Sequence, residues 1–484
     1  MNTGLLSFLI IIGYLALMLG ISIYDSRKTK TDNAEGFFLA NRGVNSVLLP
    51  LTMIAAMQST FAFLGAPGMY YTHGISYMVL VLSQVWVALM VIYFGNKISK
   101  LGRKYGYLSI GDFFQDRYES DYLKVLSSCI SVLMTIVFLA MQYVGNSRAI
   151  SVISGGIVSY KTAILISALF SLLYVIIGGA GGLILIDAIQ AVILLTGIVL
   201  AAAVAIIPSG GIVNLFKTAI ETTPELLSRP GPKGLYNAKY WVMQFIVLPF
   251  GIWLCPHVWM KSLMAKDEKA LSRSALSIPV SQVLIYGFST LFIGIAGHRL
   301  LGKVDAADNV LPLLMNNYAN WFLAALIMAA AVAAGMSTIN SMILVSSQIV
   351  SQDLILMKRK VTDKQNLILS RTIILTIVII GAIIALRPPK TLVQVVQDVA
   401  YTGLAQMAPA FVLGLYWKDA RKEGAIVGMT AGTVILFATR ILKVSPLGYP
   451  GFIWAFIINI ICMVGISMAL KSKDNTRAIE RFFV

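Results

Sequence analysis

The sequence predicts an all-α membrane protein with about thirteen transmembrane helices, and three observations lead to that fold class. Of the 484 residues, 58% are hydrophobic and only 12% are charged, whereas an average soluble domain carries about 25% charged residues. Apolar stretches of about 20 residues, long enough to cross a bilayer as helices, recur along the whole chain. Short connections separate them and carry most of the basic residues.

The predicted spans are 4–24, 45–70, 75–96, 123–147, 157–178, 182–208, 238–260, 276–302, 319–352, 369–387, 392–416, 422–442 and 451–470. The first has no cationic segment before it and is longer than the apolar core of a cleavable signal, so we expect it to be a span. Alternating the spans from an external N-terminus places 26 of the 38 Lys and Arg residues in or next to cytoplasmic segments. Basic residues favour the cytoplasmic side of short loops. We therefore predict a multi-pass protein of the plasma (inner) membrane, with its N-terminus outside and its C-terminus in the cytoplasm.

Composition also predicts what the protein lacks. The net charge of +17 lies in these topology-setting loops, so we expect no nucleic-acid partner. The three cysteines, Cys129, Cys255 and Cys462, have no paired spacing, and the three histidines are scattered, which predicts neither a disulfide framework nor a metal centre. No nucleophile and base stand together in the spans, and the tail after Leu470 is too short for a signalling domain. An enzyme, a cofactor-bearing protein and a membrane sensor are thereby disfavoured.

Two predicted spans that lie five helices apart contain helix-breaking residues. The span 45–70 carries Pro67 between two glycines, and the span 238–260 carries Pro249 and Pro256. Interrupted helices at corresponding places in two halves are typical of inverted-repeat transporters, whose unwound carbonyls can bind a cation at the centre. The alternative is a pair of ordinary proline kinks that neighbouring helices repair.

The ninth span carries a stripe of small polar residues. Ala334, Ser337, Thr338 and Ser341 recur at i, i+3, i+4 and i+7, which places them on one helical face, with Asn340 beside it. Hydroxyl and carbonyl oxygens are the hard donors that an alkali cation requires. Close helix packing with hydroxyls bonded back to the helix is the alternative. The stripe together with a buried carboxylate elsewhere favours ion binding.

That carboxylate is Asp187, which lies inside the unbroken apolar run 181–200. A charge at a helix centre costs about 2.5–3.5 kcal/mol on insertion scales, so a partner is expected, and a passing cation is our prediction for it. Asp398 is the other acidic residue as deep inside a span, and we interpret it as a packing or gate residue.

Three stretches together resemble the sodium:solute symporter family. They are Gly178–Gly182 followed by Asp187–Gln190, Ala334–Ser341 with Asp353, and Gly403–Trp417 followed by Gly424. The resemblance implies a LeuT-type core of two inverted five-helix repeats with one extra N-terminal helix and two C-terminal helices. Residues 1–484 would then form a single transporter domain, divided into the leading helix 4–24, the repeats 45–208 and 238–416, and the trailing helices 422–470.

The resemblance also implies which residues bind sodium, the coupling ion. The shared site would consist of three carbonyls and two hydroxyls, from Ala55, Gln58, Ala334, Ser337 and Thr338. A second sodium, or the release path of the first, would involve Asp187, Asn340 and Ser341. Asn340 stands where two-sodium members have serine, so both stoichiometries stay open.

The substrate is less sharply predicted. Pro256-His257, Lys261 and Met264-Ala265 resemble the branch that transports proline, pantothenate and monocarboxylates. Polar and aromatic residues within the spans are the candidates to line the substrate cavity: Gln58, Ser59, Phe61, Gln84, Gln142, Trp253, Tyr401 and Gln406.

The resulting hypothesis is a sodium-coupled symporter that imports a monocarboxylate, a pantothenate-like or an amino-acid-like solute by alternating access. Its expected partners are that solute, Na+ and the bilayer, and we expect a monomer. A sodium-coupled sugar or sialic acid symporter and a proton-coupled permease of the same fold are the alternatives.

The role of Asp187 can be tested directly. Asp187→Asn is expected to lower the transport rate more than it lowers substrate binding, because a cation path serves ion movement rather than solute recognition. Initial uptake rates and equilibrium binding of the same solute check this, and normal transport by the variant would make Asp187 a packing residue.

Overall fold

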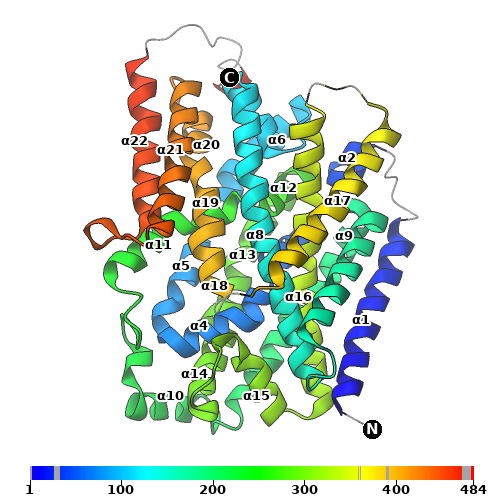
Figure 1. The fold of residues 1–484 in the computed structure, drawn as a ribbon, viewed down its shortest axis with the longest axis vertical. Coiled ribbons are helices and arrows are strands. Elements are labelled where there is room, and N and C mark those ends of the chain that lie inside the picture. The colour runs from blue at the N-terminus through cyan, green and yellow to red at the C-terminus, as the bar shows by residue number, and fades with distance from the viewer. Residues whose placement is uncertain are drawn as a thin grey trace.

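The computed structural model describes residues 3–26, 33–357, 359, 361–388, 392–470 and 481–483. Figure 1 shows long helices running side by side, with the two chain ends at opposite ends of the long axis. Of the predicted tail 471–484, only Arg481–Phe483 fall within the described residues. The described part contains one isolated β-bridge, between Val44 and Ala265, and is otherwise helical or irregular.

The helices of the first half are α1 (Thr3–Ser26), α2 (Ala34–Leu39), α3 (Leu48–Met57), α4 (Ala66–His73), α5 (Val79–Met90), α6 (Asn96–Tyr105), α7 (Ile110–Tyr118), α8 (Asp121–Ile153), α9 (Tyr160–Ile206) and α10 (Gly211–Thr222). Those of the second half are α11 (Ala238–Trp253), α12 (Pro256–Met264), α13 (Glu268–Gln282), α14 (Thr290–Leu301), α15 (Val310–Tyr318), α16 (Trp321–Gln348), α17 (Asp363–Ala385), α18 (Leu392–Val395), α19 (Thr402–Leu404), α20 (Ala408–Tyr416), α21 (Lys422–Ile441) and α22 (Gly451–Ala469). π-helical turns over Phe61–Gly65, Val91–Gly95, Val283–Ser289, Ile349–Ile355 and Val396–Tyr401 join several of them.

Ten helical stretches in the described residues are long and apolar enough to cross a membrane, and the bent pair α11–α12 makes an eleventh. The predicted number of thirteen is therefore not confirmed by this criterion. Part of the difference lies in α9, whose 47 residues would extend about 70 Å if straight, against a hydrocarbon thickness of about 30 Å. Gly179, with φ +52°, interrupts this helix at the junction of the two spans predicted there.

α16 is the central helix of the bundle. It packs against α1, α8 and α9, and every residue from Ile327 to Ile349 is buried. Small residues make this close packing possible. A Cβ added at Gly197 of α9 would come within 2.3 Å of the Ala330 side chain. The polar stripe predicted on the ninth span therefore lies in the middle of the protein.

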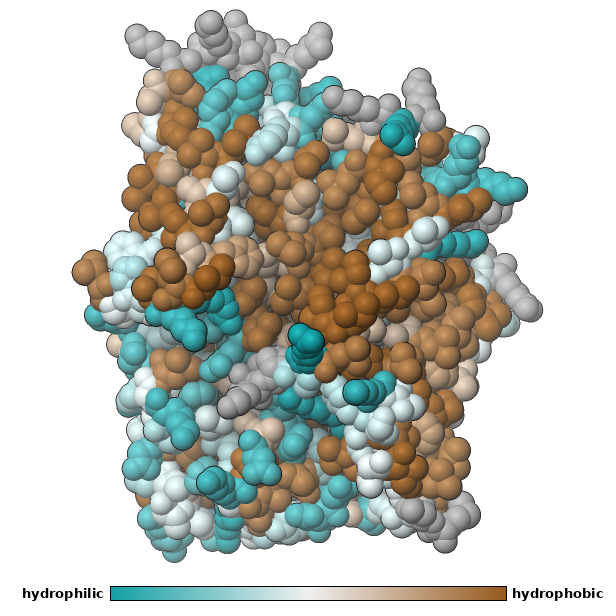
Figure 2. All heavy atoms as spheres, in the orientation of Figure 1, coloured by the Kyte–Doolittle hydropathy of each residue, from teal (hydrophilic) through white to brown (hydrophobic). Residues whose placement is uncertain are grey.

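The outer surface carries the apolar side chains that the composition predicts. Figure 2 shows brown, hydrophobic side chains over much of one face, with hydrophilic ones at its upper rim and over its lower part. Leu17 of α1 and Ile383 of α17 are among the large apolar residues that are more than half exposed. In a bilayer these side chains face lipid, in agreement with a multi-pass membrane protein.

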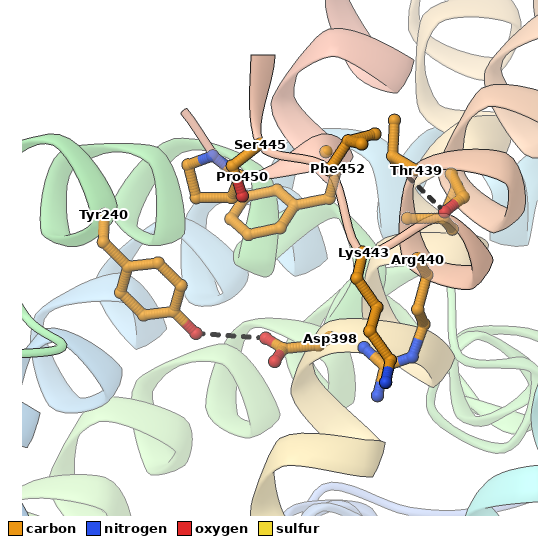
Figure 3. Close-up of a pocket in the computed structure, with 11 residues that line it drawn as sticks. Tyr240, Asp398, Thr439, Arg440, Lys443, Ser445, Pro450 and Phe452 are labelled. Atoms are coloured by element: carbon orange, nitrogen blue, oxygen red, sulfur yellow. Dashed lines mark hydrogen bonds between the residues drawn. The ribbon is translucent and has the colours of Figure 1, made fainter. Parts of the chain in front are cut away.

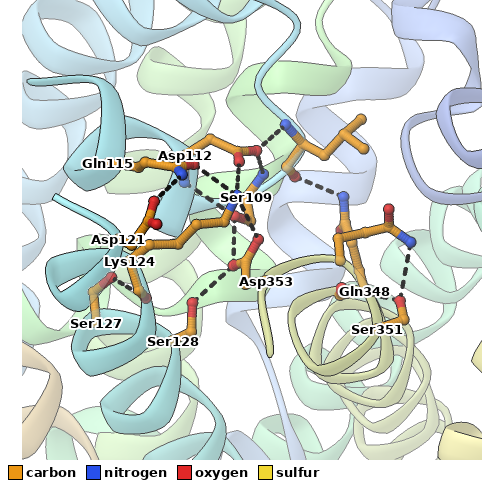
Figure 4. A network of polar contacts seen from close by, with 12 residues as sticks. Ser109, Asp112, Gln115, Asp121, Lys124, Ser127, Ser128, Gln348, Ser351 and Asp353 are labelled. Carbon is orange, nitrogen blue, oxygen red and sulfur yellow. Dashed lines mark hydrogen bonds and ion pairs between the residues drawn. The ribbon is translucent and has the colours of Figure 1, made fainter. Parts of the chain in front are cut away.

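At the end of the bundle that holds the C-terminus, a buried polar network joins α7, α8 and α16 (Figure 4). Asp353, at the end of the turn after α16, is fully buried and accepts hydrogen bonds from Ser109 Oγ (2.6 Å) and Ser128 Oγ (2.8 Å). Lys124 lies 3.6 Å from the same carboxylate and 2.6 Å from Asp112. Ser109 and Asp112 also form a capping box on α7.

Arg117 connects the C-terminal end of α7 to the end of α20. Its buried guanidinium donates to the carbonyls of Gly414 (2.6 Å) and Trp417 (2.9 Å), at the end of α20. Burial lowers the pKa of this side chain, since it disfavours the charged form. Three carbonyls, counting that of Lys418 at 3.3 Å, accept from its Nε and Nη2 atoms, while Nη1 makes no hydrogen bond within the described residues. α7 is therefore held from both sides of the bundle.

We expect Arg117→Met to lower the thermal unfolding midpoint of the purified protein. The change leaves buried carbonyls without donors at about 1–3 kcal/mol each, which corresponds to about 2 °C or more. Fluorescence-detected thermal unfolding measures the shift, and Lys269→Met, at an exposed position, is the control. A midpoint equal to that of the control would show that Arg117 does not hold α7.

Candidate functional site

The first interrupted helix breaks at Gln58–Ser59. α3 ends at Met57, Gln58 is extended (φ −95°, ψ 131°), and the chain turns helical again after Ser59. The break is therefore not at Pro67, the helix-breaking residue that marks this span in the sequence. Pro67 occupies the first turn of α4, where a missing N–H costs little, and the π-helical turn Phe61–Gly65 precedes it.

The second interruption separates α11 from α12. Pro249 stays inside α11, and the chain breaks at Leu254–Cys255 before Pro256 starts α12. The two helices meet at a bend of 52°. Of the two prolines predicted as breakers, only Pro256 therefore marks the break.

The five residues predicted to bind sodium come together at the first break. Ser337 Oγ lies 2.9 Å from the Ala55 carbonyl oxygen, and Thr338 Oγ1 lies 2.8 Å from that of Gln58. Both hydroxyls also approach the Ala334 carbonyl, at 3.0 and 3.2 Å. All five residues are fully buried. We call these three carbonyls and two hydroxyls the oxygen cluster.

The chemistry of the oxygen cluster suits a small monovalent cation. Its donors are uncharged oxygens, which match hard cations rather than transition metals. Two of the carbonyls belong to the end of a broken helix, where they point away from a continuing helical ladder. This is the arrangement in which transporter folds coordinate Na+.

A buried amide supports the far side of the break. Gln142 Oε1 of α8 accepts from both the backbone N–H (3.1 Å) and the hydroxyl (2.8 Å) of Thr60. Gln142 therefore binds the restarting helix rather than lining the cavity, in contrast to its predicted role. A Cβ added at Gly145 would come within 2.3 Å of Thr60 Oγ1, so α8 and the break are in close contact.

Asp187 is fully buried on α9 and lies close to the stripe of α16, as predicted. Ser341 Oγ is 3.5 Å from its Oδ2 atom. Its principal partner is Lys261 of α12, whose Nζ lies 3.0 Å from the same oxygen. Sequence reasoning missed this pair, although a lysine inside the apolar segment 256–264 was a usable signal.

A small cavity lies between the two broken helices. Its lining residues are Met57, Ser59, Phe61, Leu80, Gln84, Ile252, Gln282, Tyr286 and Tyr401. Four of the eight predicted substrate residues are among them: Ser59, Phe61, Gln84 and Tyr401. Gln282 was missed, although it is an amide within a predicted span like Gln84. Tyr286 and the apolar members carry no signal that separates them from packing residues.

The other predicted substrate residues have different neighbours. Gln58 contributes its carbonyl to the oxygen cluster, and its side chain is not among the cavity residues. Trp253 is fully buried and packs near Gly95. Gln406 accepts from Asn459 Nδ2 of α22 through its backbone carbonyl at 2.6 Å and through its side-chain Oε1 atom at 3.2 Å, so it holds a trailing helix.

Asp398 lies beside a separate pocket (Figure 3). Its Oδ1 atom is 3.0 Å from the Tyr240 hydroxyl and 3.5 Å from Gln244 Nε2, and Arg440 and Lys443 line the same pocket. The hydroxyl bond joins the turn Val396–Tyr401 to α11. The structure thus provides hydrogen-bond partners for the carboxylate that we interpret from the sequence as a packing or gate residue.

Two broken helices around a central cavity, beside a rigid helix that presents hydroxyls, define a membrane transporter of the LeuT type. Known structures have the same fold. A Na+-coupled sialic acid symporter in a substrate-bound outward-open state superimposes with a TM-score of 0.80 at 18% identity, covering 97% of this chain and 98% of the other. Mhp1, a nucleobase-cation-symport-1 family transporter, gives 0.60 at 13% identity, covering 94% and 99%.

The chain belongs to the sodium:solute symporter family, whose profile matches residues 37–432, and its relatives are transporters rather than enzymes. The sodium/pantothenate symporter of Haemophilus influenzae is 30% identical over 89% of both chains. That of Escherichia coli is 28% identical over 94% of both. The osmoregulated proline transporter of Bacillus subtilis is 26% identical over 97% of this chain and 96% of its own.

The support that Gln142 gives to the break leads to a prediction. Gln142→Leu leaves the N–H and hydroxyl of Thr60 without their acceptor, at a cost of about 1–3 kcal/mol, and should weaken sodium binding about tenfold. The sodium concentration that half-saturates thermal stabilisation of the purified protein measures this.

Gln406→Leu is the matched control for this experiment, since it removes a buried amide away from the break. We expect it to lower the unfolding midpoint while leaving the half-saturating sodium concentration unchanged. Equal sodium responses in the two variants would contradict a role for Gln142 at the break.

Proposed function

We propose that this protein is a sodium-coupled symporter that binds one Na+ at the oxygen cluster and imports pantothenate or a closely related small carboxylate. The observation that carries the proposal is the convergence of the Ala55, Gln58 and Ala334 carbonyls with the Ser337 and Thr338 hydroxyls beside the break of the first core helix. The family to which the chain belongs supports sodium as the coupling ion.

The residues that line the cavity are polar or apolar, and none of them carries a charged side chain. Gln84, Gln282 and Ser59 offer hydrogen-bond donors and acceptors, while Phe61 and Tyr286, with ring centroids 6.1 Å apart, offer apolar walls. Pantothenate carries hydroxyl, amide and methyl groups that match such a lining. The names of two relatives favour this solute, and proline is the second candidate because of the third.

Sodium coupling supplies enough free energy for accumulation. A membrane potential of about 100 mV contributes about 2.3 kcal/mol per charge, and a tenfold sodium gradient contributes about 1.4 kcal/mol. Together they could concentrate a neutral solute roughly 500-fold per sodium. A monoanion moving with one sodium carries no net charge, so only the sodium gradient would then drive its uptake.

In the proposed cycle the repeats 45–208 and 238–416 move relative to each other around the central site, with the N-terminus outside. Sodium would join α3 to α16 by binding oxygens of both. It would thereby favour the conformation in which the solute cavity beside Ser59 is formed.

The test is uptake of radiolabelled pantothenate into proteoliposomes with an inward sodium gradient. We expect the gradient to stimulate uptake, and Ser337→Ala with Thr338→Ala to raise the half-saturating sodium concentration at least tenfold, because each lost ligand to a charge contributes about 1.5–3 kcal/mol. Uptake that proceeds equally in sodium-free buffer would contradict the sodium assignment.

The matched control is Ser346→Ala with Ser347→Ala, a pair of buried serines two turns further along the same helix and outside the oxygen cluster. Its sodium response should equal that of the wild type. Sodium-stimulated uptake of proline, without uptake of pantothenate, would support sodium coupling and show that the solute is proline rather than pantothenate.

A further inference from the structure

Lys261 forms a buried ion pair with Asp187. It belongs to α12, which begins just after the break of the second interrupted helix and packs against α3 and α16. Its side chain and that of Asp187 are 3% and 0% exposed, and Nζ lies 3.0 Å from Oδ2. The pair is therefore enclosed by protein.

The surroundings of Asp187 have the composition of a cation site. Ser341 Oγ is 3.5 Å from Oδ2, and the neighbouring Asn340 is fully buried. Within the described residues, the Asn340 amide and the Oδ1 atom of Asp187 make no hydrogen bond. Asn340 and Ser341 lie on the same helix as Ser337, three and four residues further along. A carboxylate, a hydroxyl and an amide oxygen are hard donors for a monovalent cation.

We propose that the Lys261 ammonium takes the place of a second sodium ion beside Asp187, so that each transport cycle couples a single sodium. The inference rests on the proposed function, because it takes the oxygen cluster as the one sodium site. It also answers which of two stoichiometries this chain uses, a question that the residue types alone leave open.

The physical basis is charge balance in a medium of low dielectric. One buried carboxylate can be neutralised by one cation, and the ammonium already supplies that charge at hydrogen-bond distance. A sodium ion at the same carboxylate would stand within a few ångströms of the ammonium and be repelled by it. The lysine is covalently attached, so it neutralises Asp187 in every conformation in which the pair is formed.

The number of coupled sodium ions determines whether the membrane potential drives uptake. With one sodium per cycle, import of a monoanion moves no net charge, and the resident ammonium adds none because it does not cross the membrane with the solute. Uptake of a monocarboxylate would then depend on the sodium gradient and be insensitive to the membrane potential.

The experiment counts bound ions directly, without any organic solute. Equilibrium binding of ²²Na+ to the purified full-length protein in detergent should give one site in the wild type. In Lys261→Met, Asp187 loses its cation while the oxygens around it remain, and we expect two sites and a Hill coefficient that rises from one toward two. Lys261→Met combined with Asp187→Asn should return the count to one.

Lys266→Met is the matched control, since its side chain lies at an exposed position just after α12, and it should bind one sodium. Binding of two sodium ions to the wild type would overturn the inference. This result does not depend on whether Lys261→Met folds. A single ion on a folded Lys261→Met variant would overturn it as well.

Failure of the proposed function has a different signature. Absence of specific ²²Na+ binding to the wild type, or binding that survives Ser337→Ala with Thr338→Ala unchanged, would contradict the oxygen cluster. Two ions on the wild type, one of which is lost in that double variant, would contradict only the role of Lys261. Uptake of radiolabelled pantothenate into proteoliposomes at clamped membrane potentials gives the second readout. We expect the uptake rate to depend on the membrane potential only in Lys261→Met.

Discussion

The structure depends on one constraint, which is that a bilayer core offers no water to backbone groups that leave a helical ladder. The break at Gln58–Ser59 exposes such groups in the middle of the bundle. Thr60 satisfies its N–H through Gln142, and the carbonyls on the other side of the break meet the hydroxyls of Ser337 and Thr338. The same geometry that repairs the broken helix therefore gathers the oxygens of the candidate ion site.

Burial of the charged Asp187 side chain also costs free energy. A buried ion pair is weak support for stability, because desolvation can exceed the attraction between its members. Lys261 nevertheless meets this carboxylate from α12, one of the helices that flank the second break. Both helix breaks thus contribute to one polar region beside α16.

The features of the fold that depend on local sequence could be predicted, and those that depend on tertiary contact could not. Long apolar runs located the helices, and the spacing of the stripe on α16 placed Ser337 and Thr338 on one face. Pro67, one of the residues that marks this span as interrupted in the sequence, does not lie at the break, because a proline in the first turn of a helix is harmless. Gln142 of α8 instead binds the chain just after the break at Gln58. Lys261 and Gln282 are polar residues inside apolar segments, but their neighbours Asp187 and Gln84 belong to distant helices, so these contacts became visible only in the structure. Gln406 was predicted as a cavity residue, but its side-chain Oε1 atom accepts from Asn459 of α22 and it is not among the residues that line the cavity.

The position of the oxygen cluster on α16 explains how a small ion could influence a large protein. α16 is buried from Ile327 to its last residue, and its far end is fixed where Asp353 accepts from Ser109 and Ser128 and faces Lys124. α3, by contrast, ends at the break. In the proposed function, sodium would bind oxygens of both helices and fasten the interrupted one to the fixed one. An ion changes a conformational equilibrium only by the difference in its affinity for the two states. A site divided between a fixed and an interrupted helix provides that difference, because it is complete only when the two are together.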